Sequence, residues 1–256
     1  MLIEPMPAYA YPLLIAAGFV AGFVNTLAGS GSLVTLPALI FLGLPPTVAN
    51  GTNRLAILMQ NMVAVSRFRD FGVLEVRKSG RLAVPAVLGA ILGARLAVDL
   101  DEELLRRTIG ALFLLLLPVI ALRPRRWLVG RRSDRVEHGR PVWVALFFIG
   151  VYGGFIQAGV GVFLLVCLVL GAGYDLVRAN AIKVLIVLCF TVFALAVFLR
   201  HDQVAWLPGL TLGVGNMAGA WWATRVATER GTRFVRWLLL IVVAVSGVLL
   251  VIGWKL

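Results

Sequence analysis

The two halves of this chain align with each other at one constant offset, so the sequence contains an internal repeat. The offset is 130 residues (159 minus 29 for Gly29 and Gly159), and it holds without a gap over about eighty residues. A duplication of this length in an apolar chain is typical of transporters whose related halves meet at a central site. The matching pairs include Ala28 with Ala158, Gly29 with Gly159, Gly31 with Gly161, Gly43 with Gly173, Asn50 with Asn180, Gly89 with Gly219 and Arg95 with Arg225.

The composition indicates that lipid is the solvent for most of the chain. Hydrophobic residues make up 61% of the sequence and charged residues 14%, whereas a soluble domain carries roughly 25% charged residues. The net charge of +12 comes from short basic segments between apolar runs, which reports membrane topology and argues against nucleic acid as a partner. Cys167 and Cys189 both lie inside apolar runs, so neither a disulfide framework nor a CxxC metal site is available. We expect no metal and no cofactor.

Six apolar runs are long enough to cross a hydrocarbon core of about 30 Å as helices. Two further apolar stretches, 8–43 and 142–173, are each too long for one span. Glycines interrupt both at equivalent places, Gly29-Ser30-Gly31 and Gly159-Val160-Gly161, where helical geometry is easily lost. Each stretch is therefore predicted to be a hairpin with a non-helical break. The six spans are 48–66, 80–98, 104–122, 178–199, 205–224 and 234–254.

Basic segments between the runs predict the orientation, because Lys and Arg near helix ends resist translocation. The segments 67–81, 123–140 and 225–236 are rich in arginine and are placed in the cytoplasm. The loops 99–103 and 200–204 then fall outside. With this alternation each hairpin leaves and returns to the same side of the membrane, and the two hairpins start from opposite sides.

The predicted fold is an all-α polytopic membrane protein made of two inverted repeats. Each repeat is a broken re-entrant hairpin followed by three transmembrane helices. The N-terminal repeat covers 1–122 and the C-terminal repeat covers 141–256, with 123–140 as a basic cytoplasmic linker. Both termini are predicted to lie outside the cytoplasm.

Broken hairpins inside a membrane suit an anion. The interruption exposes backbone N–H groups where the dipoles of half-helices converge. Ser30 and Ser32 add hydroxyl donors near the first break, and Gln157 precedes the second. In the alternative interpretation these glycines only allow close helix packing, as small residues do throughout membrane bundles.

A second group of polar residues opens the next span in each half. Asn50 corresponds to Asn180, and Asn53 corresponds to Lys183. A cation with amide neighbours beside a positive helix end would make a selective anion site. Alternatively, Lys183 snorkels to the membrane surface. Arg54 and Arg178 are expected at the interface, while Gln60, Asn61 and Asn216 are expected to bridge helices by hydrogen bonds.

Missing residue types argue against an enzyme. No Asp or Glu lies at the centre of a predicted span, and His138 and His201 both lie in loops. Acid-pair proteolysis, Ser-His catalysis and histidine-rich metal transport therefore have no candidate residues. Export of an anion needs no carboxylate, because the membrane potential contributes about 2.3 kcal/mol per charge per 100 mV.

The motif GFVNTLAGSGSLVTLPALIFLGLPPTVANGTNRL and its degenerate copy GGFIQAGVGVFLLVCLVLGAGYDLVRANAIKVL resemble the TauE/SafE family of sulfite exporters, also called the toluene sulfonate uptake permease family. The resemblance covers nearly the whole chain. It implies transport of sulfite or organosulfonate anions and a bacterial inner-membrane location. The chain departs from the family pattern in its short Gly-Ser-Gly-Ser run and in Val160, which stands opposite Ser30.

We therefore predict a transporter that exports a small sulfur-containing anion by alternating access. A channel-like anion pathway is the alternative, and a membrane enzyme ranks third. The expected partners are the anion (sulfite, a sulfonate or a related oxyanion) and the lipid bilayer, and a homodimer is compatible with the sequence. The predicted substrate-binding residues are Gly29, Ser30, Gly31, Ser32, Asn50, Thr52, Asn53, Gln157, Gly159, Val160, Gly161, Asn180 and Lys183.

Overall fold

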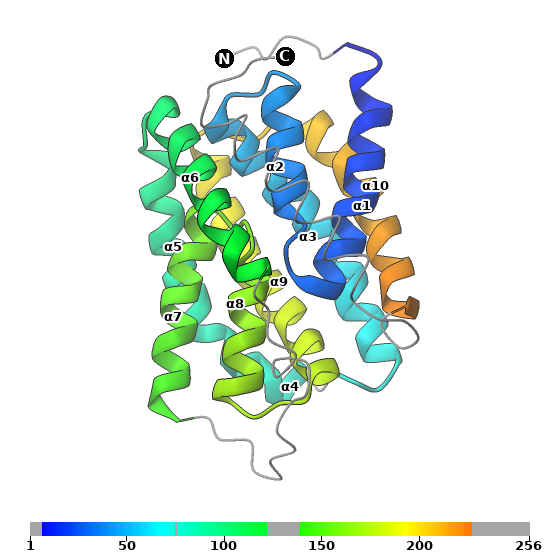
Figure 1. Cartoon of the computed structure of the whole chain (residues 1–256), viewed down its shortest axis with the longest axis vertical. Coiled ribbons are helices and arrows are strands. Elements are labelled where there is room, and N and C mark those ends of the chain that lie inside the picture. Colours follow the sequence, from blue (N-terminus) through cyan, green and yellow to red (C-terminus); the bar gives the residue numbers. More distant parts are fainter. Residues whose placement is uncertain (1–6, 75, 122–138, 227–256) are drawn as a thin grey trace.

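A computed structural model of the chain describes residues 7–74, 76–121 and 139–226. Over these ranges all regular structure is helical and no strand occurs, which confirms the all-α prediction. Most helices run along the long axis of the molecule (Figure 1). The predicted span 234–254 and nearly all of the linker 123–140 lie outside the described residues.

The helices lie close to the predicted runs. Five predicted spans correspond to α3 (Pro46–Asp70), η1 (Gly80–Leu82) with α5 (Ala83–Val98), α6 (Glu102–Ala121), α9 (Leu176–Arg200) and α10 (Trp206–Val226), and a short α4 (Val76–Ser79) precedes η1. α3 begins with Pro46 at its first position, where a proline loses no hydrogen bond. α9 begins after Asp175, whose carboxylate accepts the backbone N–H groups of Val177 (3.1 Å) and Arg178 (3.0 Å).

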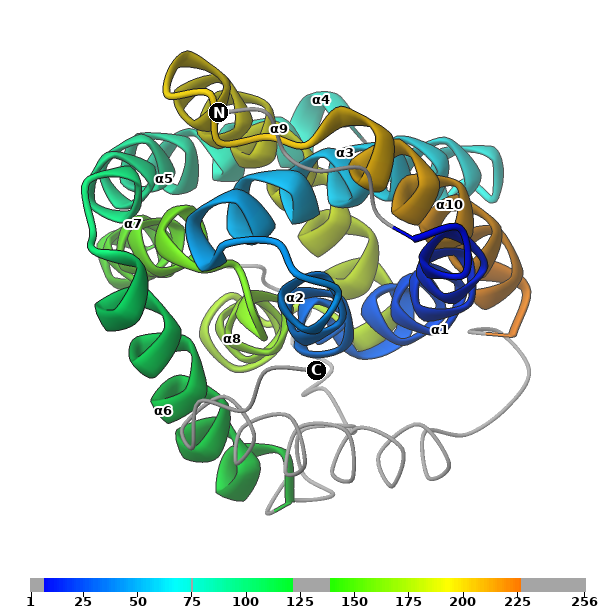
Figure 2. The same ribbon diagram turned by 90° about the horizontal axis from the view of Figure 1, so that it is seen from above.

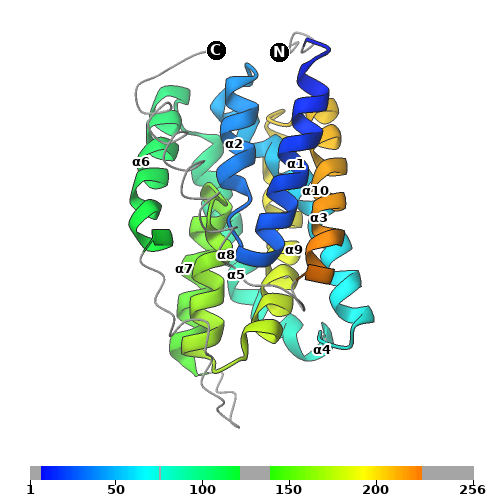
Figure 3. The same ribbon diagram turned by 45° about the vertical axis from the view of Figure 1, so that its right-hand side comes forward.

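Each over-long stretch forms two helices that meet at a break. The first comprises α1 (Ala10–Ala28) and α2 (Ser32–Phe41), and the second comprises α7 (Arg140–Phe155), α8 (Val160–Val166) and a π-helical turn, Cys167–Gly171. In Figures 1 and 3, α1 descends from the upper end of the molecule and α2 returns to it, whereas α7 and α8 occupy the lower part.

The second break lies earlier than predicted. Residues 29–31 are non-helical, as expected, but the second interruption covers 156–159, so that Val160 and Gly161 already belong to α8. Gln157 (φ 64°) already adopts the left-handed conformation two residues before Gly159 (φ 70°), so the helix is interrupted ahead of the glycine pair. The Tyr152 hydroxyl donates to the carbonyl oxygen of Ala158 (2.6 Å) and holds the turn in place.

The first helix of each hairpin packs against a helix of the other half of the chain. α1 lies along α10, and α7 lies along α5, as Figure 2 shows from above. Glycines permit the close approach, because a Cβ on Gly22 would collide with the backbone of Asn216, and one on Gly154 would collide with Ala90. Each hairpin is therefore held in place by the opposite half.

The N-terminal halves of α3 and α9 lie in the interior of the molecule, and the two helices contact each other (Figure 2). Residues 46–57 of α3 and 179–187 of α9 are buried without interruption. A helix buried on every side sits inside a bundle rather than on its surface. These two segments carry Asn50, Asn53, Asn180 and Lys183, so the sequence places its polar residues in the protein interior.

Backbone conformations also recur at the offset of 130. Gly29 (φ 76°) corresponds to Gly159 (φ 70°), and Gly43 (φ 97°) corresponds to Gly173 (φ 79°). Gly72 (φ 68°) corresponds to Asp202 (φ 54°), although the residue type differs. Left-handed residues are uncommon, so three such pairs at one spacing indicate that the backbone conformation repeats together with the sequence.

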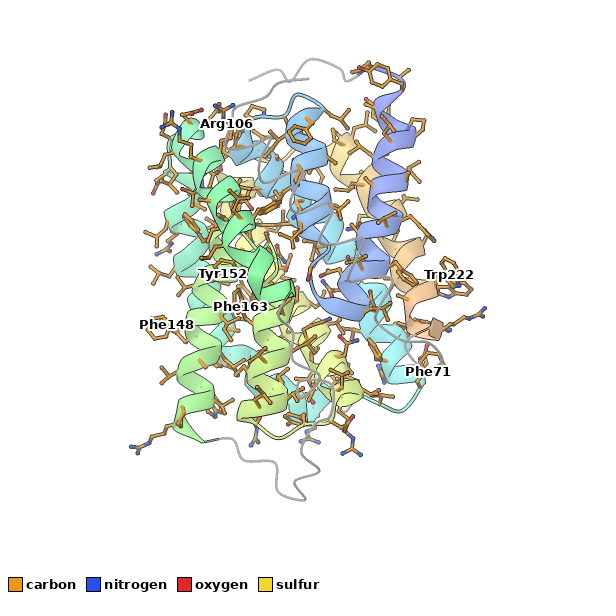
Figure 4. All side chains as sticks on the ribbon, viewed as in Figure 1. Phe71, Arg106, Phe148, Tyr152, Phe163 and Trp222 are labelled. Atoms are coloured by element: carbon orange, nitrogen blue, oxygen red, sulfur yellow. The ribbon has the colours of Figure 1, made fainter. Side chains whose placement is uncertain are left out.

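Three helical segments in the described part of the chain are long and apolar enough to cross a membrane. They are Ala10–Leu27, Gly80–Val98 and Leu176–Arg200. The first of these lies in α1, whose 19 residues extend about 28 Å at about 1.5 Å per residue. This length is close to the thickness of the hydrocarbon core, about 30 Å. Large apolar side chains such as Phe148 (63% exposed) and Trp222 (50% exposed) point outward from the bundle (Figure 4), as lipid-facing residues do.

Replacing Gly161 by alanine tests whether the two breaks touch. A Cβ on Gly161 would collide with Cα of Gly29, so we expect Gly161→Ala to lower the free energy of unfolding by about 2 to 3 kcal/mol through overpacking. Gly43→Ala is the control, because Gly43 has positive φ but nothing within 4 Å of its Cβ position, and it should lose only about 1 kcal/mol. Unfolding in detergent measures both. A loss for Gly161→Ala no larger than that for Gly43→Ala would show that the breaks do not meet.

Candidate functional site

The two helix breaks meet in the protein interior. The backbone N–H of Gly161 donates to the carbonyl oxygen of Gly29 at 3.1 Å, and a Cβ built on Gly29 would lie 2.5 Å from Cα of Gly161. Only glycine allows this approach. The structure therefore brings together the glycines of both predicted breaks.

Arg54 caps the broken end of α7. Its guanidinium donates to the carbonyl oxygens of Gly153 (3.1 Å), Gly154 and Phe155 (3.3 Å). It also donates to Oε1 of Gln157 (3.3 Å) and Oδ1 of Asn50 (3.4 Å). These carbonyls have no intrahelical donor because α7 stops there, and a cation matches the negative end of the helix dipole.

Asn50 supports the same helix end. Its Nδ2 donates to the carbonyl oxygen of Phe155 at 2.8 Å. Asn50 and Arg54 lie one helical turn apart on α3, so both side chains leave the same face. Their partners belong to the other half of the chain.

Lys183 and Asn180 of α9 make the reciprocal arrangement at the broken end of α1. Nζ of Lys183 donates to the carbonyl oxygens of Asn25 (3.0 Å) and Thr26 (3.3 Å) and to Oδ1 of Asn180. Nδ2 of Asn180 donates to the carbonyl oxygen of Thr26 at 2.7 Å. Each half thus contributes one cation and one asparagine to the hairpin of the other.

Both cations are fully enclosed by protein. Arg54 is 0% exposed and Lys183 is 2% exposed. The expectation that Arg54 lies at the membrane interface is therefore wrong, because the carbonyls of α7 draw it into the core. The snorkelling alternative for Lys183 is wrong for the same reason. Arg178, by contrast, is exposed and pairs with Asp175 at 3.4 Å.

The core carries positive charge without a buried acid. Among the described residues, the buried polar set contains Arg54 and Lys183 but no Asp or Glu. The hydrogen bonds given above for both cations go to neutral oxygens, and the ring of Phe198 lies 4.6 Å from the Arg54 guanidinium carbon. Burying a cation is unfavourable unless it is well hydrogen-bonded, and the carbonyl oxygens at the broken helix ends supply such bonds to both.

Neutral polar side chains gather beside the first break. Thr35 donates its hydroxyl to Oδ1 of Asn53, and Nδ2 of Asn25 donates to Oε1 of Gln60 at 3.1 Å. Nδ2 of Asn53 and Nε2 of Gln60 are buried and find no acceptor among the described residues. Unpaired buried donors are rare in folded proteins, so this cluster has two amide NH₂ groups that could donate to a ligand oxygen.

The second half lacks this cluster. The positions 130 residues after Asn25, Thr35 and Gln60 are Phe155, Leu165 and Phe190. Lys183 stands where the first half has Asn53. The amide donors thus come from one half only, and the two halves are chemically unequal at their shared centre.

Several predicted site residues have hydrogen-bond or packing partners within the protein. Thr52 accepts the backbone N–H of Ala205 (2.9 Å) and faces the start of α10. Nε2 of Gln157 donates to the hydroxyl of Thr191 at 2.8 Å. Val160 packs near Gly153. Ser30 and Ser32 are buried beside the first break, and the N–H of Gly31 points to Oδ1 of Asn25 at 3.4 Å.

Sequence reasoning missed Arg54 as a central residue and gave Gln60 a bridging role only. Gln60 does bridge α3 to α1 through Asn25, whereas Asn61 donates to Ile57 of its own helix (2.9 Å). The spacing of Arg54, four residues after Asn50, is the signal that could have identified it. No group of three or more His, Cys, Asp or Glu residues that could hold a metal ion occurs within the described ranges.

Comparison with known proteins identifies the family. The family model described as sulfite exporter TauE/SafE matches residues 14–250. The chain belongs to the TauE/SafE family. This confirms the resemblance. The names of the family and of its relatives indicate a membrane transporter and point away from an enzyme.

Relatives span nearly the whole chain. A "Probable membrane transporter protein ORF9" from Sinorhizobium sp is 30% identical over 240 residues, 94% of this chain and 92% of the relative. The "Probable membrane transporter protein YfcA" of Escherichia coli strain K12 is 28% identical, covering 91% of this chain and 88% of the relative. A "Probable membrane transporter protein" from Haemophilus influenzae is 26% identical, covering 88% of each. No solved structure matches the chain significantly.

Removing the Arg54 side chain tests its capping role. Arg54→Ala leaves the carbonyls of Gly153, Gly154 and Phe155 without this donor, so the free energy of unfolding should fall by about 3 kcal/mol. The matched control is Arg178→Ala, whose exposed ion pair should contribute less than about 1 kcal/mol. Denaturant unfolding in micelles compares them. Equal losses would mean that Arg54 does not hold the helix end.

Proposed function

We propose that this TauE/SafE protein exports a small sulfur-containing anion, sulfite or an organosulfonate, by alternating access. The observation that carries the proposal is a core with two buried cations, unpaired amide donors and, in the described part, no buried acid. Such a site favours a small oxyanion over a cation or a neutral solute. The family description, sulfite exporter, agrees with this chemistry.

The proposed binding site lies between the hairpin breaks and the first turns of α3 and α9. Lys183 supplies positive charge, and Nδ2 of Asn53 together with Nε2 of Gln60 donates to the oxygens of the anion. The backbone near Gly29, Ser30, Gly31, Ser32, Gly159, Val160 and Gly161 surrounds the ligand. Asn50 and Asn180 hold the helix ends in place, since their amides already donate to carbonyl groups.

We propose that the two halves, 1–122 and 141–256, are inverted repeats with re-entrant hairpins. The recurring left-handed residues and the exchanged packing of α1 with α10 and of α7 with α5 support a two-fold relation. The hairpins open toward opposite ends of the molecule (Figure 3). Repeats of this kind can rock against each other around a fixed site, which is how alternating access proceeds.

The driving force proposed for export is the membrane potential. An anion bound without a cotransported cation carries net negative charge outward, and the potential contributes about 2.3 kcal/mol per charge per 100 mV. The described core holds no buried carboxylate that would bind a proton or a metal cation beside the anion. Net export is therefore favourable without a further energy source.

Anion affinity tests the proposed site. In sodium-free buffer, Lys183→Ala should weaken sulfite binding by about 1.5 to 3 kcal/mol, the contribution of a charge-assisted interaction. The sulfite affinity of Lys183→Gln should lie between those of the wild-type protein and Lys183→Ala. Asn53→Ala should weaken binding by about 1 kcal/mol. Asn61→Ala is the control on the same helix, because its amide already bonds to Ile57. Calorimetry at matched monodispersity gives the affinities.

Unchanged sulfite affinity in both Lys183→Ala and Asn53→Ala would remove these residues from the site. Binding of taurine or sulfoacetate in place of sulfite would keep the site and change the substrate. A flux that does not saturate and shows no counterflow would replace the alternating-access mechanism by a channel.

The orientation is tested by thiol labelling. We propose that the linker 123–140 lies in the cytoplasm and that the loop 99–103 and both termini lie outside the cytoplasm of a bacterial inner membrane. In a background without Cys167 and Cys189, an impermeant reagent on whole cells should label Glu102→Cys, an exposed position, and spare Ser133→Cys. The opposite labelling pattern would reverse the topology.

A further inference from the structure

The cations at the two broken helix ends occupy positions that resemble metal-ion sites. Lys183 is surrounded by the carbonyl oxygens of Asn25 and Thr26 and by Oδ1 of Asn180. Arg54 is surrounded by three backbone carbonyl oxygens and two side-chain oxygens. Carbonyl groups at the C-terminal ends of half-helices are the ligands with which ion-coupled carriers bind sodium.

We propose that Lys183 and Arg54 are built-in replacements for a coupling cation. Each side chain fills a cage of oxygens that would otherwise bind a hydrated monovalent metal ion, and it supplies the same positive charge from within the chain. The inference rests on the proposed transport of an anion and adds that this transport needs no sodium or potassium ion.

The geometry of the cages supports this assignment. The oxygens around Lys183 belong to the last turn of α1 and to Asn180, whose own amide is fixed on Thr26 (2.7 Å). These acceptors therefore stay in place when the lysine side chain is removed. Lys183 is 2% exposed, so its removal leaves a polar, enclosed space. Buried acceptors without a donor are unfavourable, and a small cation is the simplest ligand to satisfy them.

The test compares three full-length proteins at equal ionic strength in sodium chloride and in choline chloride. Lys183→Ala opens the cage, whereas Lys183→Met removes the charge but keeps the volume filled. We expect sodium to raise the melting temperature of Lys183→Ala in a saturable manner. The melting temperature of the wild-type protein should be the same in sodium chloride and in choline chloride. The same should hold for Lys183→Met. Sodium should also restore part of the sulfite affinity that Lys183→Ala has lost.

Two results would overturn the proposal. One is a sodium-dependent rise in the melting temperature of the wild-type protein, which would reveal an open metal site. The other is a Lys183→Ala protein that folds but does not respond to sodium. If Lys183→Ala is recovered in neither salt, Arg54→Ala is judged by the same criteria at the second cage.

A flux measurement on the wild-type protein decides the question without any variant. Sulfite efflux from proteoliposomes should proceed at the same rate when choline replaces sodium and potassium on both sides. A requirement for either metal ion would overturn the proposal. A wild-type protein that neither binds nor moves sulfite or a sulfonate would instead overturn the proposed function. The sodium response of Lys183→Ala, measured by unfolding, would still show whether the oxygens around Lys183 can bind a metal ion.

Discussion

The carbonyl groups at the broken ends of α1 and α7 set the main constraint on this protein. Inside a bilayer no water satisfies them, and an unpaired backbone group there costs several kcal/mol. The chain meets this need with Lys183 and Arg54, each reaching from the half that does not contain the break. The close contact of Gly29 with Gly161 and the deep burial of α3 and α9 follow from this exchange.

The same exchange produces the chemistry of the centre. Two buried cations neutralise the dipole ends, and the described core contains no buried acid, so the centre carries positive charge. The unpaired donors at the centre come from Asn53 and Gln60. The related halves have therefore diverged: the first supplies the unpaired amides of Asn53 and Gln60, and the second carries Lys183 at the position that corresponds to Asn53. In the proposed inverted-repeat arrangement, one ligand would bind between the two halves while the surrounding helices move from one orientation to the other.

Much of this architecture could be predicted from sequence, because apolar run length fixes helix positions and a repeated glycine marks each break. The role of Arg54 could not, since its partners lie about a hundred residues away and a basic residue near a helix start usually reaches the membrane surface. The second break was misplaced because Gln157, a residue type without a turn preference, adopts the left-handed conformation there. The burial of Arg54 and the position of the second break both involve contacts between the two halves, such as the hydrogen bond from Arg54 to Gln157, and a sequence does not show such contacts.

Locating a bound oxyanion is the most direct test of the account. Selenite has the shape and charge of sulfite, and its selenium scatters anomalously, so a crystal of the protein grown with selenite would reveal its position. The account predicts one strong peak beside Nδ2 of Asn53 and the Gly29 and Gly161 contact, within reach of the charge on Lys183. A peak elsewhere in the bundle, or an empty centre in a protein that binds selenite in solution, would contradict it.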